Sequence, residues 1–178
     1  TLDGSLSVNF NIQGTDKRQV TKNLVAASRG LFDHWLAVDR GQSALMAYSS
    51  EGTRFSKSVP GQELVDLALT HRSQILVLDR KTAQVSRLNL DFENVGSPLS
   101  NSWKRAERLA SDAAGNVYVL DRAESRIDLF NRDGEDRGSV GPSLPGGIRL
   151  RAAADLSVDG EGRLYIVDSK LQQVIVLE

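Results

Sequence analysis

Cysteine is absent from the 178-residue chain, and aromatic residues make up only 6% of it. Without cysteine there are no disulfides, no thiolate metal ligands and no cysteine nucleophile. Neither sign of charge dominates, because 22 basic residues face 23 acidic ones and leave a formal net charge of −1. We therefore expect no global attraction to nucleic acid or to an acidic membrane. No apolar run approaches the roughly 18 residues of a membrane span, so the sequence predicts no transmembrane segment.

The chain does contain a repeat of about forty-odd residues. Four short apolar runs each end in an aspartate, and these residues, 40, 42 and 47 positions apart, are Asp39, Asp79, Asp121 and Asp168. Each run is rich in β-branched or aromatic side chains, and a second apolar run follows each aspartate. A period in this range with short strands is typical of propeller blades. The sequence predicts an all-β fold, a β-propeller of four-stranded antiparallel blades, four of them in this chain.

The predicted blades span about 20–59, 62–96, 106–141 and 150–178. An inner strand with small residues such as Ala110 and Ala153 precedes each central hairpin, and Gly115 and Gly134 mark tight turns. Outer strands are expected at 54–59, 92–95 and 137–140. Helices are hard to place in this pattern, and 102–109 is the one segment that could make a helical turn. Trp35, inside a predicted strand, is expected in the core.

The fourth blade has no outer strand of its own before the chain ends at Glu178. The alternating segment 5–12 offers one, so residues 1–12 either close a four-bladed ring or end a preceding blade of a longer propeller. The chain begins at Thr1 instead of Met, which indicates a processed product or a fragment and favours, weakly, an exported protein.

The third and fourth repeats resemble the NHL repeat. Its pattern of Asp-x-x-Gly-Asn, a strand ending in Asp, then Arg-Ile or Arg-Val and Phe, is matched by Asp112 to Asp121 followed by Arg126 to Gly134. Residues 158–168 and 173–176 match it well, and the first two repeats keep only the aspartate and the apolar pattern. The resemblance implies a propeller that commonly has six blades, and some members bind single-stranded RNA on a basic face.

The four strand-ending aspartates invite a metal-site interpretation, but a structural role is favoured. An aspartate at the end of a strand can accept the backbone N–H groups of the following turn. The two histidines, His34 and His71, have no third ligand of the usual type nearby in the sequence. We therefore expect no metal site, no cofactor and no catalytic residue. The metal-centred sites of NHL-like propeller lyases and lactonases have no matching constellation here.

The candidate binding residues lie on one face of the predicted propeller. Loops between second and third strands share that face with the loops that join blades, and these loops carry an excess of basic residues. Trp103 beside two basic residues has the composition of an interaction hot spot, although it could instead fill the groove between the second and third blades. The predicted partner-binding residues are Arg80, Trp103, Lys104, Arg105, Arg122 and Arg149.

The leading functional hypothesis is a non-catalytic protein-binding or scaffold module that docks the acidic surface of another protein. The first alternative is a structural subunit or fragment whose open edges complete a larger propeller. Single-stranded RNA binding comes next, and the scarcity of exposed aromatic residues for base stacking makes nucleic acid an unfavoured partner. A metal-dependent lyase or lactonase is the last alternative.

Overall fold

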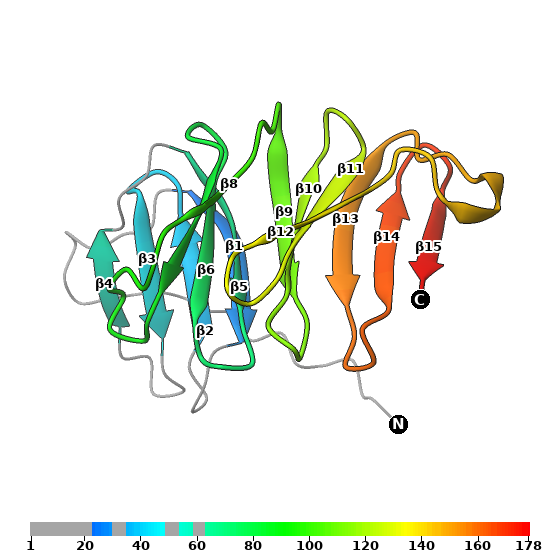
Figure 1. Ribbon diagram of the computed structural model, residues 1–178. Helices are drawn as coiled ribbons and strands as arrows, with labels where there is room; N and C mark the ends of the chain where they lie inside the picture. Colours follow the sequence, from blue (N-terminus) through cyan, green and yellow to red (C-terminus); the bar gives the residue numbers. More distant parts are fainter. Residues whose placement is uncertain (1–22, 30–34, 49–53, 59–62) are drawn as a thin grey trace, which may run out of the picture.

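The computed structural model describes residues 23–29, 35–48, 54–58 and 63–178. In these residues the chain forms four antiparallel β-sheets, each of three or four strands (Figure 1). The predicted all-β class is therefore confirmed. The predicted strand at 5–12 and His34 lie outside the described residues.

Each sheet is one blade, and its strands follow one another in sequence order. The first blade contains β1 (Leu24–Arg29), β2 (Trp35–Asp39), β3 (Ala44–Tyr48) and β4 (Arg54–Ser58). The second contains β5 (Leu64–Leu69), β6 (Ile75–Asp79), β7 (Gln84–Leu88) and β8 (Leu99–Ser100). The third contains β9 (Ala106–Ser111), β10 (Val117–Asp121), β11 (Arg126–Phe130) and β12 (Asp136–Val140). The fourth contains β13 (Ala153–Val158), β14 (Leu164–Asp168) and β15 (Gln173–Leu177).

The predicted outer strand at 92–95 is wrong. Residues 89–93 form a turn instead, in which the side chain of Asn89 accepts the N–H groups of Asp91 and Glu93. Phe92 takes a positive φ of 61° in that turn and is buried between the first two blades. The outer strand forms later, at β8, after residue 94 makes one isolated bridge to Leu88.

The segment 102–109, the one place where the sequence allowed a helical turn, forms none, because residues 106–109 belong to the inner strand β9. Near the start of each inner strand, one residue has no partner in the second strand, so the pairing shifts by one residue. In blades one to four these unpaired residues are Val25, Val65, Glu107 and Ala154. Such a bulge puts one extra residue into the inner strand and turns its side chain relative to the ladder. The bulge therefore decides what lies beside the propeller axis.

The core consists of one apolar cluster between each pair of neighbouring blades. Alternate side chains of a strand point to opposite faces of the sheet. Leu76 and Leu78 of β6 accordingly pack with Val117 and Val119 of the third blade. The same two faces meet between the first and second blades and between the third and fourth. Every blade thus has a face toward its predecessor and a face toward its successor.

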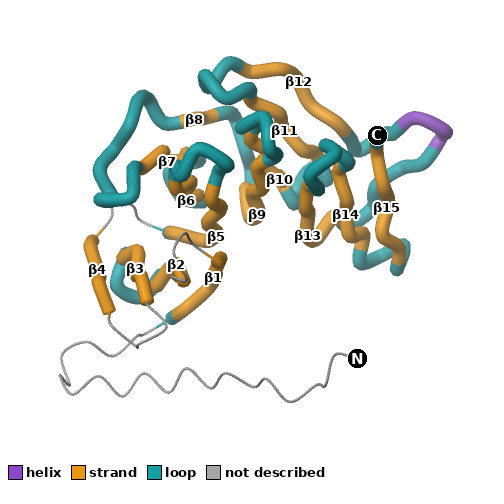
Figure 2. Tube along the Cα trace, turned by 90° about the horizontal axis from the view of Figure 1, so that it is seen from below, coloured by secondary structure: helices purple, strands orange, loops and turns teal. Residues whose placement is uncertain are grey.

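The four blades stand side by side in an open arc around a common axis (Figure 2). Their inner strands β1, β5, β9 and β13 contact one another in that order. The first and fourth blades occupy the two ends of the arc. The third blade, which has a neighbour on either side, is therefore covered on both faces by apolar side chains, whereas the fourth blade leaves Val167 and Val174 exposed on the face away from the third.

Candidate functional site

The upper loop face comprises the turns 40–43, 80–83, 122–125 and 169–172, at the top of Figure 1, together with the interblade segments 101–105 and 141–152, the second of which extends to the right in that view. The strand-ending aspartates organise it. Asp121 is fully buried and accepts the N–H of Lys104 at 2.7 Å and that of Arg105 at 3.1 Å. It also accepts the N–H of Ala123 at 3.0 Å. One carboxylate thus joins the incoming interblade segment to the outgoing turn.

Two other aspartates repeat this arrangement. Asp79 accepts N–H groups from Glu63, Lys81 and Thr82. Asp168 accepts four, from Arg151, Ala152, Lys170 and Leu171. Burial raises the pKa of Asp168, but these backbone bonds outweigh it and hold the pKa below its usual range. The bonds are those expected of turn-fixing residues.

Three arginines of the upper loop face converge on one buried carboxylate, that of Glu107 near the start of β9. Arg105 Nε lies 2.6 Å and Arg80 Nη1 2.9 Å from Glu107 Oε1, and Arg122 Nη1 lies 3.0 Å from Glu107 Oε2. Burial alone raises the pKa of Glu107, but the hydrogen bonds and charges of Arg122 and Arg105 outweigh it and lower the pKa. The side chain of Glu107 is 8% exposed, whereas those of Arg105 and Arg122 are 54% and 44% exposed. The cluster therefore presents positive charge to solvent.

The remaining predicted contacts differ in how far they reach solvent. Lys104 is exposed and pairs with Glu124 at 2.5 Å. Arg149 is exposed and donates to Ser143 Oγ at 3.3 Å. Arg80 is held between Glu107 and Glu63, with both of which it forms ion pairs. The side chain of Arg80 is thus held by two carboxylates and is less exposed than those of Arg105 and Arg122.

A pocket of about 420 Å³ lies beside Arg149, between the third and fourth blades. Arg149, Arg151 and Lys170 line it together with Glu124 and the apolar wall of Leu150 and Pro142. Three cations around one carboxylate leave an excess of positive charge. Sequence reasoning did not single out Arg151 or Lys170 as contacts, although both were on the predicted basic face.

Trp103 is buried and does not form an exposed hot spot. It packs in the cluster between the second and third blades, with its ring edge-on to Phe130 at a centroid distance of 6.0 Å. Its indole N–H donates to Asp128 Oδ2 at 2.5 Å. The groove-filling alternative describes its position. Trp35, expected in the core, is instead exposed on the first blade.

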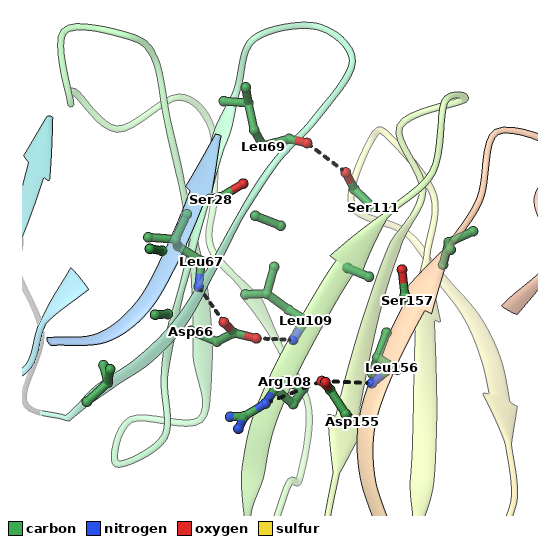
Figure 3. Close-up of a pocket in the computed structure, with 16 residues that line it drawn as sticks. Ser28, Asp66, Leu67, Leu69, Arg108, Leu109, Ser111, Asp155, Leu156 and Ser157 are labelled. Carbon is green, nitrogen blue, oxygen red and sulfur yellow. Dashed lines mark hydrogen bonds and ion pairs between the residues drawn. The ribbon is translucent and has the colours of Figure 1, made fainter. Parts of the chain in front are cut away.

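A second, axial pocket of about 480 Å³ is lined by the inner strands of all four blades (Figure 3). Its charged residues are Asp66, Arg108 and Asp155, which occupy equivalent positions of β5, β9 and β13. Asp66 accepts the N–H of Leu109 at 2.9 Å, across the blade boundary. Arg108 Nε lies 3.4 Å from Asp155 Oδ1. These groups mainly tie neighbouring inner strands together.

Burial raises the pKa of Asp66 to about 6, and its backbone hydrogen bonds from Leu109 and Leu67 offset this only in part. Of the two histidines, His71 is exposed near a turn. Within the described ranges, no group of three histidine or acidic side chains is arranged to hold a metal ion. In that same part of the chain, none of the helical structure is long and apolar enough to cross a membrane.

Sequence reasoning missed Glu107 and Asp66. Asp66 is the one charged residue of β5, and Glu107 stands next to Arg108 in β9, so a charge within an inner strand is the signal that the sequence offered. Whether such a side chain points to the upper loop face or into the axis depends on the bulge beside it. A bulge is a feature of pairing with another strand, so it cannot be located from the strand's own residues.

The structure is similar to several solved β-propellers. Virginiamycin B lyase from Staphylococcus aureus matches 90% of this chain and 56% of its own length, with a TM-score of 0.68 and 7% identity. The propeller domain of Cps50 (Swd1) from Myceliophteria thermophila matches 86% and 52%, at a TM-score of 0.66 and 12% identity. A chain of a nidogen–laminin complex matches 89% and 76%, at a TM-score of 0.59 and 15% identity.

The chain spans about half the length of the lyase and Cps50 chains that it matches. No protein-family model matches it, and no curated protein is significantly similar in sequence. At these identities the likeness shows the fold alone, so the predicted β-propeller is confirmed. The NHL repeat stays a resemblance of the third and fourth blades.

Proposed function

We propose that this chain is a non-catalytic binding module whose upper loop face docks the acidic surface of another protein. The observation that carries the proposal is the cluster around Glu107, in which Arg105 and Arg122 are anchored at one edge and exposed at the other. Anchored arginines lose little side-chain entropy on binding a carboxylate, and their planar guanidinium groups can bind it with two hydrogen bonds.

The docking surface extends from this cluster to the pocket between the third and fourth blades. Its proposed contacts are Lys104, Arg105, Arg122 and Arg149 of the predicted set, with Arg151 and Lys170 added by the pocket. Trp103 does not belong to it, because a buried indole offers no contact area. Arg80 is assigned a positioning role, since two carboxylates hold it.

Occurrence in a protein complex, which a binding role requires, is found for one propeller of similar structure. It was solved in a nidogen–laminin complex. Another is a lyase, but the axial pocket of this chain supports catalysis less well. Asp66 accepts two backbone N–H groups there, and Asp155 binds one N–H and an arginine. These carboxylates have structural partners that a reaction would have to break.

RNA binding is less well supported than protein binding. Base stacking needs exposed aromatic side chains. The upper loop face as described contains one aromatic residue, Trp103, and it is buried. The basic residues of this face could attract the phosphates of a nucleic acid. Any basic surface has this attraction, and it weakens steeply as the salt concentration rises.

The test uses an acidic peptide of about twenty glutamates as the probe and nuclear magnetic resonance to map where it binds. We expect shifts at residues 104–105, 122–124, 149–151 and 169–170. In Lys104→Glu/Arg149→Glu, affinity should fall at least tenfold, or about 1.4 kcal/mol. The matched control, Arg72→Glu/Arg132→Glu, reverses two exposed arginines outside the upper loop face and should bind within about twofold of the parent.

An oligouridine of ten nucleotides provides the second arm. Tighter binding of that RNA than of the peptide, with a steep dependence on salt, would favour the RNA alternative. Equal losses of peptide affinity in the two double variants would contradict a localised docking face.

A further inference from the structure

The three interfaces between blades follow one rule. Side chains at the second and fourth positions of the central strand, such as Leu76 and Leu78 of β6, point toward the next blade. The second residue of the third strand, such as Val85 of β7, lies in the same cluster. The next blade packs against them with the side chains at the first and third positions of its own central strand, such as Val117 and Val119.

At the fourth position of the central strand, the first three blades have Val38, Leu78 and Leu120, and each of these side chains is 0% exposed. At the second position of the third strand they are Leu45, Val85 and Ile127, also each 0% exposed. Six side chains in two equivalent positions are therefore completely covered by the following blade and the residues around it.

The fourth blade keeps aliphatic residues at both positions and leaves them exposed. Val167 is 38% exposed and Val174 is 60% exposed. Val176, beside Val174 on the same face of β15, is exposed as well. Among the described residues β15 is also the outermost strand of a three-stranded sheet. The successor face of this blade thus has the chemistry of an interface.

The inner strands carry a second, independent observation. Asp66 on β5 accepts the N–H of Leu109 on the inner strand of the following blade. Asp155 occupies the equivalent position on β13 and, like Asp66, accepts the N–H of the next residue in its own strand. The side chain of Asp155 is exposed beside the axis. Both partners of Asp155 among the described residues, the Leu156 N–H and Arg108, lie at Oδ1, whereas Asp66 uses Oδ2 to bind the inner strand of the following blade.

We propose that the successor face of the fourth blade, Val167, Val174 and Val176 with Asp155, docks one further propeller blade. The docking blade presents aliphatic side chains at the first and third positions of its central strand, as Leu164 and Ile166 do toward the third blade. Its inner strand donates a backbone N–H to Asp155. The inference is independent of the binding function proposed for the upper loop face.

A second copy of this chain fits the role less well. It would have to offer the predecessor face of its first blade. Ala37, Ala44 and Met46 on that blade are already buried in the present structure. The occupant that the face fits is therefore a further blade with an uncovered predecessor face.

The absence of cysteine makes a direct test possible, because a single introduced thiol is unique. Val174→Cys reports on the successor face, Lys170→Cys is the exposed reference, and Ile127→Cys is the buried equivalent. In the 178-residue chain we expect Val174→Cys to react with a maleimide at a rate within about threefold of the exposed reference, and Ile127→Cys to react at least 100-fold more slowly.

The probe blade is a second copy of residues 142–178 joined after Glu178, since this sequence docks on the third blade in the protein itself. In the extended chain the labelling of Val174→Cys should slow at least tenfold. A Val167→Glu substitution in that extended chain should restore fast labelling, because it buries an unpaired charge in the new interface.

Three results would overturn the proposal. Slow labelling of Val174→Cys in a monomeric 178-residue chain would mean that the chain covers this face itself. Slow labelling in a dimer that light scattering detects, relieved by dilution, would assign the face to a second copy. Unchanged labelling of Val174→Cys in the extended chain would mean that the added blade does not dock on the fourth blade, although the same sequence docks on the equivalent face of the third blade. This conclusion holds whether or not the amides of the added blade resist hydrogen exchange.

Discussion

Asp121 illustrates at the scale of one residue how this propeller holds its loops. Its fully buried carboxylate accepts three backbone N–H groups, two from the interblade segment and one from the turn. An unpaired buried donor costs about 1–3 kcal/mol. We expect Asp121→Ala to lower the free energy of unfolding by at least about 3 kcal/mol, measured by urea unfolding.

The matched control is Asp133→Ala, which removes an aspartate from an exposed turn. It should change stability by less than about 0.5 kcal/mol. Similar losses in the two variants would contradict the turn-fixing role of the strand-ending aspartates.

The turns that these aspartates fix contain a strained residue that the sequence did not reveal. The last turn residue has a positive φ in all four blades, and it is never glycine: Ser43, Ala83, Ser125 and Gln172. The left-handed conformation costs a residue with a β-carbon roughly 1–2 kcal/mol. A turn position with a positive φ is usually occupied by glycine. Here the hydrogen bonds from the turn to the aspartate offset the cost, so other residues can occupy the position.

Gln172→Gly tests that strain at an exposed position, where the native φ is 55°. Relief of the strain is partly cancelled by the greater freedom of glycine in the unfolded chain. We expect a net stabilisation of a few tenths to about 1 kcal/mol in urea unfolding. Gln173→Gly, one residue later in β15, should destabilise instead, and the same sign in both variants would contradict the argument.

At the scale of the element, Trp103 shows what sequence reasoning could and could not resolve. A tryptophan beside Lys104 and Arg105 fits an exposed hot spot and a groove filler equally well. The deciding contact is with Asp128, 25 residues further along the chain. Only the tertiary fold brings Asp128 beneath the interblade segment, so the local composition could not choose.

Trp103→Phe keeps most of the packing and removes the indole donor from a buried carboxylate. We expect it to lower the free energy of unfolding by about 1–3 kcal/mol, and Trp103→Ala by about 3–5 kcal/mol. Trp35→Phe, at an exposed position, should cost less than about 1 kcal/mol. In that variant the remaining indole, Trp103, should resist iodide quenching, and strong quenching would contradict its burial.

The inner strands make a prediction about pH, because the pKa of Asp66 is raised to about 6. The folded chain then binds a proton at this carboxyl more tightly than the unfolded chain does, between about pH 4 and pH 6. Its contribution to stability is therefore most favourable below about pH 4 and declines as the pH rises through that window. Relative to Asp66→Asn, the parent chain should gain stability on acidification from pH 7 to pH 4.

Urea unfolding of the two proteins at four pH values in that range measures the difference. A stability difference that moves in the opposite direction would show that the hydrogen bonds to Leu109 and Leu67 outweigh burial at this carboxyl. The carboxyl carbon of Asp66, followed by nuclear magnetic resonance, should titrate with a midpoint near 6.

At the scale of the whole molecule, the repeat was enough to predict the fold. The central hairpins β2–β3, β6–β7, β10–β11 and β14–β15 carry the alternating apolar residues that define the period. Outer strands were harder, because they pack at the rim and need few apolar residues. β8 has only two residues, and nothing in Leu99–Ser100 distinguishes it from a loop. Val167 and Val174 of the fourth blade are exposed although their equivalents in the first three blades are buried, and their aliphatic side chains give no sign of that difference in the sequence.

That difference between the fourth blade and its neighbours sets an expectation for hydrogen exchange. The amides that β11 donates to β10 lie in a blade with a neighbour on either side, whereas β15 is the outermost of the described strands of its sheet and has an exposed face. Few buried contacts lower the free energy of local opening. We expect the amides that β15 donates to β14 to exchange at least tenfold faster than their equivalents in β11.

The amides that β7 donates to β6 serve as the control and should exchange at the same rate as those of β11. Equal protection in β15 would mean that the fourth blade is as firmly held at one end of the arc as the third is within it, and that its valines are covered in solution.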